Sequence, residues 1–300
     1  MITHPDKVLF PDDGITKGEL VSYYDAVAPV MLPHVSGRPA TLERYPSGIG
    51  QKGFWQKNVA KSSPGWLAKV EVPKKGGSVR YPLVSDVRAL RWAANLNTIT
   101  LHVWSSRVPA LQHPDLCVFD LDPAGEEPDA LRAAALGVRE LLEELELPSF
   151  VKTTGSKGFH VVVPLDGEAA AGDVARFAHA AATRLVERHP KRLTLEFYKA
   201  DRGGRILVDI GRNGFGATYA AAYSVRAKPG APVSAPCTWQ ELERKEVSPR
   251  SFGLRSMPAR IAAVGDMWSD LPHRACSLRT AMERLGLPDK ELRYDPRRGR

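Results

Sequence analysis

The order of secondary structure expected between residues 115 and 210 is the feature that most constrains the fold. Segments with the two-residue period of strands and segments with the 3.6-residue period of helices follow one another as β-α-β-β-α-β. These segments cover residues 115–122, 129–146, 149–154, 159–164, 172–188 and 205–210, and a further strand is expected to pair locally at 193–198. This order is that of the ferredoxin-like fold, which RNA-recognition modules also use, and it predicts an α+β protein without fixing a function.

Two aspartates, Asp120 and Asp122, end the first of these strands. Because side chains alternate along a strand, both carboxylates leave one face, while Phe119 and Leu121 point to the other face and predict a core there. Pro123 lacks an amide donor and ends the pairing of the strand. Two adjacent like charges are unfavourable without a partner, and an all-oxygen pair suits magnesium or manganese. The alternative is a strand that ends in a solvated turn.

A third aspartate, Asp209, lies in the last strand of the unit. A lone buried aspartate usually caps a turn. In the ferredoxin-like order, however, the first and last strands can be neighbours, so Asp209 could join Asp120 and Asp122 on one surface. Three carboxylates without a nearby histidine or cysteine are what two hard cations need, and substrate phosphates supply the remaining ligands in phosphoryl-transfer sites. The sequence therefore favours a metal site over a simple turn.

A turn with two glycines, between the second and third strands, brings positive charge to the unit. Thr154, Lys157 and His160 surround Gly155 and Gly158, which allow a ligand to approach the backbone closely, and turn amides can bind phosphate oxygens. The segment lacks the spacing of a Walker loop, and a plain hairpin with an exposed lysine is the alternative. Beside the acids we expect a triphosphate site, for which three arginines are further candidates: Arg202, Arg212 and Arg226.

The charge balance of the chain agrees with an anionic partner. The net charge of +8 and the pI near 9.4 favour a polyanion, although the C-terminal arginines at 297, 298 and 300 contribute to both values. No apolar stretch reaches the roughly 18–20 residues of a membrane span, and the first residues lack the pattern of a signal peptide. Cys117, Cys237 and Cys276 are widely spaced and predict neither a disulfide framework nor a zinc site. We therefore expect a cytoplasmic protein.

The first 110 residues predict a separate α/β unit. A helix over 17–32 follows Thr16, which forms a capping-box pattern with Glu19. Further elements are expected at 40–45, 68–72, 79–82, 86–96 and 98–104. Phe54 and Trp55 are adjacent, so we expect one of them to pack inward while the other could stack on a base, and a purely structural pair is the alternative. Lys7 and Lys17 flank a turn, where they are either solvated or bind a ligand.

Three motifs occur in order along the chain: Asp-Leu-Asp-Pro at 120–123, Thr-Gly-Ser-Lys-Gly-Phe-His at 154–160 and Val-Asp-Ile-Gly-Arg-Asn at 208–213. Together they resemble the archaeo-eukaryotic primase superfamily, and most closely the polymerase domain of bacterial DNA ligase D and its free-standing relatives. The likeness runs from about His4 to Arg226 and beyond. It implies the primase fold, with the ferredoxin-like unit packed against the N-terminal unit. The implied division is a single domain over 1–300, with units at 1–110, 111–226 and 227–300.

The resemblance also implies roles for individual side chains. Asp120, Asp122 and Asp209 would bind two catalytic metals, manganese or magnesium. An incoming nucleotide would contact Thr154, Lys157, His160, Arg226, His102, Arg44, Phe54, Trp55 and Arg202. The 5′-phosphate of a downstream DNA strand would contact Lys7, Lys17 and His4. Three positions depart from the family pattern, since Trp55 replaces a phenylalanine, Glu43 stands where lysine can occur, and His4 stands where some relatives have asparagine.

The implied activity is that of a DNA-directed nucleotidyltransferase that extends primers and fills short gaps, as in Ku-dependent end joining, with ribonucleotides preferred. Implied partners are gapped or broken DNA with a 5′-phosphate, NTP or dNTP, Ku and a DNA ligase, at the bacterial nucleoid and without a membrane. No Lys-x-Asp-Gly adenylation motif occurs, because residues 199–202 read Lys-Ala-Asp-Arg, so ligation is not expected. De novo priming and a non-catalytic single-stranded nucleic-acid-binding module are the alternatives.

Overall fold

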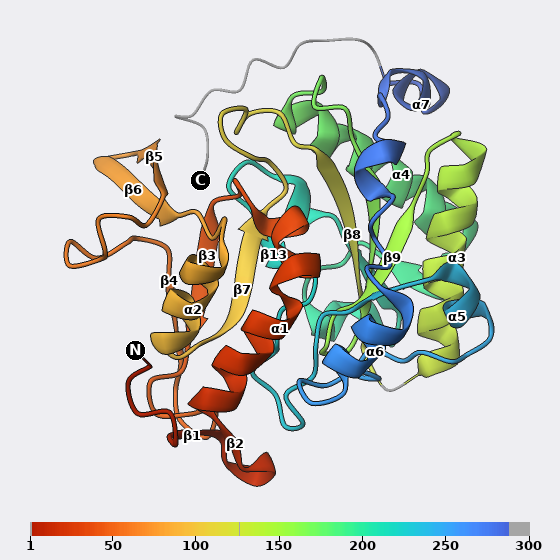
Figure 1. The fold of residues 1–300 in the computed structure, drawn as a ribbon. Coiled ribbons are helices and arrows are strands. Elements are labelled where there is room, and N and C mark those ends of the chain that lie inside the picture. Colours follow the sequence, from red (N-terminus) through yellow and green to blue (C-terminus); the bar gives the residue numbers. More distant parts are fainter. Residues whose placement is uncertain (1, 126, 288–300) are drawn as a thin grey trace.

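Two β-sheets carry the architecture of the chain in the computed structural model, which describes residues 2–125 and 127–287 (Figure 1). The basic run at 297–300 lies outside the described residues. The N-terminal sheet contains four strands in the spatial order β13 (Thr218–Ala220), β7 (Thr98–Trp104), β3 (Ala40–Arg44) and β4 (Phe54–Gln56). Within the described residues, no helix is long and apolar enough to cross a lipid bilayer.

The larger sheet contains six strands and confirms the ferredoxin-like unit. Its spatial order is β11 (Leu193–Thr194), β12 (Ile206–Asp209), β8 (Leu116–Asp122), β10 (Phe159–Pro164), β9 (Phe150–Thr153) and β14 (Pro236–Cys237). The last strand of the predicted unit, β12, pairs antiparallel with the first, β8, and β10 pairs antiparallel with both β8 and β9. The neighbouring positions of β8 and β12 are the relationship on which the predicted acid cluster depends.

The two faces of this larger sheet have different coverings. Helices α3 (Pro128–Glu144) and α4 (Ala171–Arg188) lie against one face, where Phe119 and Leu121 join their apolar stripes in one core (Figure 1). On the opposite face, Val118 and Val162 belong to the core of the N-terminal unit. The alternation along β8 therefore directs the aspartates toward the face shared with that unit.

The N-terminal unit is built on two helices whose starts are fixed locally. Helix α1 (Lys17–Val35) begins with the predicted capping box, because the amide of Glu19 donates to the Thr16 hydroxyl and the Glu19 carboxylate accepts from the Thr16 amide. The helix continues three residues past its predicted end at 32. Helix α2 (Val87–Asn95) is capped by Asp86 and packs beside α1. Both helices contribute to the first apolar core.

The remaining elements are short. They are β1 (Val8–Phe10), β2 (Ile15–Thr16), β5 (Lys69–Lys74), β6 (Gly77–Pro82), α5 (Trp239–Glu243), α6 (Met257–Val264), α7 (Arg279–Arg284) and the 3-10 turns η1 (Pro11–Asp13), η2 (Lys199–Arg202), η3 (Gly211–Asn213) and η4 (Leu271–Arg274). Strand β13 follows the larger sheet in the chain but joins the N-terminal sheet, and β14 returns from the C-terminal segment to the larger sheet. Each sheet therefore contains strands from more than one of the three predicted units. The boundaries between these units, at 110/111 and 226/227, stay a prediction.

One strand is shorter than expected. The predicted strand at 193–198 ends at Thr194, and the chain then leaves the sheet. The guanidinium group of Arg202 donates hydrogen bonds to the carbonyl oxygens of Glu196 (3.2 Å) and Phe197 (2.8 Å). Because these carbonyls accept from Arg202, the segment is held beside the sheet rather than in it.

Candidate functional site

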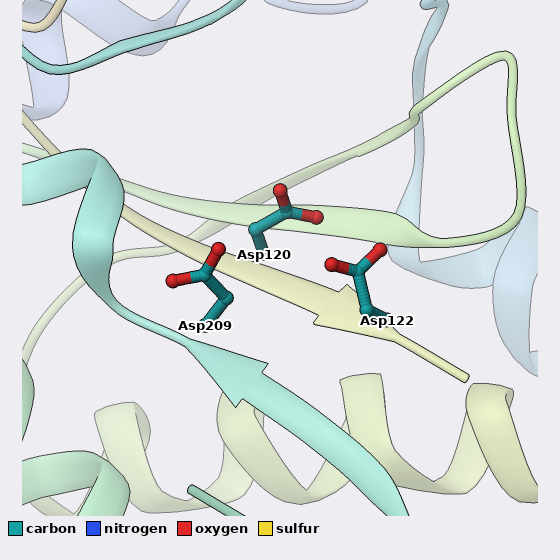
Figure 2. A group of neighbouring side chains, drawn as sticks. All are labelled: Asp120, Asp122 and Asp209. Carbon is teal, nitrogen blue, oxygen red and sulfur yellow. The ribbon is translucent and has the colours of Figure 1, made fainter. Parts of the chain in front are cut away.

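The three predicted acids meet on one face of the larger sheet (Figure 2). Asp120 and Asp122 project from β8, and Asp209 stands opposite Asp120 in the register of β12 with β8. One carboxylate oxygen of each residue lies within 4.8 Å of the others. Three hard oxygen donors at this spacing could hold a divalent metal ion. The predicted convergence of the acids is therefore confirmed.

The electrostatics of the cluster indicate charge that lacks enough compensation. Burial, followed by the charges of Asp120 and Asp209, raises the pKa of Asp122 from 3.8 to about 6. Burial also disfavours the charge of Asp120, but His160 and Arg212 outweigh it and lower the pKa of that carboxyl. One acid is therefore firmly ionised while its neighbour holds its proton more tightly, which is the pattern expected where carboxylates crowd a site.

Arg212 neutralises part of this charge. Its guanidinium lies 3.2 Å from Asp120 Oδ2 and 3.1 Å from Asp209 Oδ2. Asn213 anchors the same turn, since its amide side chain donates to the Val118 carbonyl (2.8 Å) and accepts from the Val118 amide (2.7 Å). Arg212 is one of the three arginines that are candidates for triphosphate binding, and the structure places it against the acids. The anchoring role of Asn213 was not predicted.

A row of polar side chains crosses four strands of the sheet. Asp209, Asp120, His160 and Lys152 are successive register partners on β12, β8, β10 and β9. His160 Nε2 lies 3.2 Å from Asp120 Oδ1, and burial, followed by Lys152, lowers the pKa of His160 to about 4. His160 is therefore neutral near pH 7 and faces the acid cluster.

Lys152 is a site residue that the sequence reasoning missed. Its side chain is fully buried, and its ammonium group donates to the Ser234 hydroxyl. Burial, followed by Arg226, lowers the pKa of Lys152 to about 7. The available signal was a single charged residue inside the apolar strand Phe150–Thr153.

The glycine-rich turn is closed by Thr154. The Thr154 hydroxyl donates to the Gly158 carbonyl (3.0 Å) and accepts from the Gly158 amide (3.1 Å). A Cβ on Gly158 would lie 1.9 Å from the Leu121 carbonyl oxygen, so this turn can pack on β8 only with glycine there. Arg226 joins from the next segment and donates to the Thr154 carbonyl (2.7 Å), while Lys157 is exposed at the tip. The structure thus brings Arg226 to the turn that carries Thr154 and Lys157.

The aromatic pair differs from the expectation that one ring packs inward. Phe54 and Trp55 are 45% and 54% exposed, because β4 is the edge strand of its sheet. The Phe54 ring lies under the guanidinium of Arg44 (5.2 Å), and the Trp55 ring lies 4.3 Å from the ring of His102. Both rings are therefore partly exposed, one beside the Arg44 guanidinium and the other beside the His102 ring.

His102 and Glu43 form a buried pair beneath Trp55. His102 Nε2 lies 3.2 Å from Glu43 Oε2, and Tyr45 donates to Glu43 Oε1 (3.0 Å). Burial lowers the pKa of His102 to about 4. Burial opposes the charge of Glu43, but hydrogen bonding to His102 outweighs it and lowers the pKa of Glu43 to about 2. Glu43 stands where lysine can occur in the family, and here its carboxylate orients the His102 ring.

The N-terminal basic residues lie around one turn. Lys17 is 3% exposed and donates to the carbonyl (2.7 Å) and hydroxyl (2.9 Å) of Thr3, so the alternative of a solvated side chain is wrong for this residue. Burial, followed by the charges of Lys7 and Arg44, lowers the pKa of Lys17. Lys7 and His4 are exposed, and the Lys7 amide donates to the His4 carbonyl.

Arg202, a predicted nucleotide contact, lies at the end of β8, where its guanidinium donates to the Asp122 carbonyl (3.4 Å).

Comparison with known proteins agrees with this geometry. The sequence profile described as the LigD primase-polymerase domain matches residues 16–268. The chain is 34% identical over 273 residues to the multifunctional non-homologous end joining protein LigD of Mycolicibacterium smegmatis, covering 90% of this chain and 36% of that protein. It is 36% identical over 275 residues to the corresponding DNA repair protein of Mycobacterium tuberculosis, covering 89% of this chain and 36% of that protein.

A solved structure agrees at the level of the fold. The polymerase domain from Mycobacterium tuberculosis ligase D, in complex with DNA, superposes with a TM-score of 0.86 at 35% identity, covering 92% of this chain and 98% of that one. The chain spans about a third of the length of the curated mycobacterial relatives it matches. The profile match, the relatives and the shared fold together establish that this chain belongs to the family of LigD primase-polymerase domains.

Proposed function

We propose that the chain is a DNA-directed nucleotidyltransferase that extends primers and fills short gaps in DNA repair, including Ku-dependent end joining. The observation that carries the proposal is the meeting of Asp120, Asp122 and Asp209 within 4.8 Å in a member of this family. A non-catalytic binding module would have no use for three crowded carboxylates, one of which has a raised pKa.

The acid cluster fits a pair of hard divalent cations, which we take to be manganese or magnesium. All three side chains offer carboxylate oxygens, and the raised pKa of Asp122 shows that added positive charge would be favourable there. When bound, such ions activate an attacking hydroxyl and neutralise a leaving pyrophosphate. Arg212 compensates part of the charge of the acids, and its side chain is 38% exposed, so a phosphate could reach its guanidinium.

The surrounding residues supply the nucleotide site. The backbone of the turn at 154–158, with Lys157 and Arg226, provides donors for a triphosphate. Phe54 and Trp55 offer exposed rings for stacking on bases, and Arg44 and His102 hold those rings in place. NTP and dNTP are both accommodated by this chemistry, and ribonucleotides are the preferred substrates by family likeness.

The test is primer extension on a gapped duplex that carries a 5′-phosphate, with Mn²⁺ or Mg²⁺. We expect Asp122→Ala to lose extension, while Asp129→Ala, which removes an exposed aspartate on α3, extends as wild type does. Extension by Asp122→Ala at the wild-type rate would refute the metal role. Products formed on an unprimed template with ribonucleotides would instead identify de novo priming.

The cellular setting follows from the same family. The relatives are named for non-homologous end joining. We infer that this chain acts on broken or gapped DNA in the bacterial cytoplasm at the nucleoid, together with Ku and a DNA ligase. Co-purification with Ku on DNA ends that carry a 5′-phosphate is the expected result, and excision-repair gap filling would require no such association.

A further inference from the structure

A second aromatic pair lies apart from Phe54 and Trp55. Phe197 and Tyr198 are 67% and 72% exposed, and they are the two most exposed large apolar side chains in the described part of the chain. Their rings are nearly perpendicular, with centroids 5.7 Å apart. Large apolar side chains that are exposed next to each other on a protein surface can mark an interaction site.

The backbone that carries this pair is held in place although it has left the sheet. Arg202 donates to the carbonyl oxygens of Glu196 and Phe197, and the Glu196 amide donates to the Thr194 hydroxyl (3.0 Å). The Tyr198 carbonyl accepts from the amide of Asp201 (3.0 Å) at the start of η2. The exposed rings therefore stand on a fixed backbone.

The same arginine connects the pair to the acid cluster. A third nitrogen of Arg202 lies 3.4 Å from the carbonyl oxygen of Asp122, at the end of β8. The strand that precedes the pair, β11, is parallel to β12, which carries Asp209. The aromatic pair therefore lies beside the carboxyl end of the strand that bears two of the three acids.

The charge around the pair suits a polyanion. Between residues 191 and 205 the basic side chains outnumber the acidic ones, Glu196 and Asp201. The basic residues are Lys191, Arg192, Lys199, Arg202 and Arg205. Exposed aromatic faces beside cationic side chains are the features by which proteins bind unpaired nucleotides, because the rings stack on bases while the cations pair with phosphates.

We propose that Phe197 and Tyr198 form a stacking platform for the unpaired bases of a single-stranded DNA segment at the acid cluster. The platform rests on the proposed function only in assigning that segment to the strand whose end is extended. It is separate from the Phe54–Trp55 pair, which belongs to the edge strand of the other sheet. Two separate platforms would allow one strand and one nucleotide to be held independently.

The test is the affinity of the full chain for a fluorescently labelled single-stranded oligonucleotide, measured by anisotropy at fixed salt. Because aromatic rings stabilise bound bases by stacking, we expect Phe197→Ala with Tyr198→Ala to raise Kd by roughly 10- to 100-fold, which corresponds to about 1.4–2.8 kcal/mol. Replacing both residues with tryptophan should retain binding. Trp66→Ala, which removes another exposed aromatic ring, should leave Kd within about twofold of wild type.

An abasic oligonucleotide of the same length separates stacking from charge. We expect wild type and the double alanine variant to bind this abasic strand equally, because it offers phosphates but no bases. A double variant that binds the normal oligonucleotide as wild type does, or that loses equal affinity for both strands, would overturn the platform. Asp122→Ala should lose nucleotide transfer while keeping oligonucleotide affinity, so failure of the proposed function is distinguishable from failure of the platform.

Discussion

Asp209 lies directly opposite Asp120 across the antiparallel pairing of β12 with β8. This pairing places carboxylates from two distant parts of the chain on one face, and the alternation along β8 adds Asp122 to them (Figure 2). Burial of Asp122, followed by the charges of Asp120 and Asp209, raises the pKa of this carboxyl to about 6. Folding therefore creates a site that is electrostatically unfavourable until cations occupy it.

We predict that Asp122→Asn stabilises the metal-free protein at neutral pH. The folded protein holds the Asp122 proton up to a pKa of about 6, whereas the ordinary value is 3.8, so wild type loses stability as the pH rises through this window. Relative to wild type, the variant should gain about 1–3 kcal/mol of unfolding free energy at pH values above about 6, and nothing at pH values below 3.8. Urea denaturation in the presence of EDTA, across the window, measures this difference.

Addition of Mn²⁺ should make wild type more stable than Asp122→Asn. Mn²⁺ binds the folded wild type and raises its unfolding free energy, while the variant lacks one carboxylate and gains less. Asp129→Asn is the control, because its side chain is 72% exposed and belongs to helix α3 rather than to the strands that carry the cluster. If Asp122→Asn were less stable than wild type in EDTA near neutral pH, burial and the neighbouring carboxylates would not disfavour the charge of Asp122.

Lys152→Met is expected to remove a pH dependence of stability. The folded pKa of Lys152 is about 7 and the ordinary value is 10.5, so the unfolded chain binds the extra proton between these values and wild type gains stability as the pH rises. Methionine has a similar length and no charge. The unfolding free energy of the variant should therefore exceed that of wild type by a few kcal/mol near pH 6.5, and this difference should decrease toward pH 9. Lys69→Met, at an exposed position on β5, serves as the control. Parallel pH profiles for wild type and Lys152→Met would show that Lys152 keeps its charge in the folded state.

The N-terminal lysines should distinguish DNA ends. Replacing Lys7 and Lys17 together with alanine should weaken binding to a gap with a 5′-phosphate more than to the same gap without it. Lys7 is exposed, so Lys7→Ala alone should lower this discrimination by about fivefold without changing Tm. Lys17→Ala should in addition lower Tm, because the Lys17 ammonium holds Thr3. Anisotropy with the two duplexes, with Lys57→Ala as the control, measures the effect, and equal losses on both duplexes would indicate only general electrostatics.

Gly158→Ala should disrupt the glycine-rich turn. The added Cβ would lie 1.9 Å from the Leu121 carbonyl oxygen, so either the turn or β8 must shift. We expect a loss of about 1–3 kcal/mol of unfolding free energy together with loss of nucleotide binding. At Gly65 an added Cβ meets no atom within 4 Å, so Gly65→Ala is the control and should behave as wild type. Wild-type stability and nucleotide binding in Gly158→Ala would show that close packing of this turn on β8 is not required.

The local parts of the fold could be predicted because each depends on near neighbours in the chain. The period of two along β8 placed Asp120 and Asp122 together, and the capping box of Thr16 and Glu19 fixed the start of α1. The order of periodic segments also indicated that β12 could lie beside β8 and bring Asp209 to the cluster, as the structure confirms. Periodicity and capping are read from a few adjacent residues, so they do not require knowledge of the packed structure.

The environment of single charged side chains was decided only by the tertiary structure. Arg212 contacts the acids, Lys152 is buried against Ser234, and Lys17 is covered by Thr3. Trp55 stays exposed because β4 ends its sheet. Whether a charge is buried depends on which distant segments pack over it. The free-energy cost of burying it is offset by polar partners that cannot be identified from neighbouring residues in the sequence.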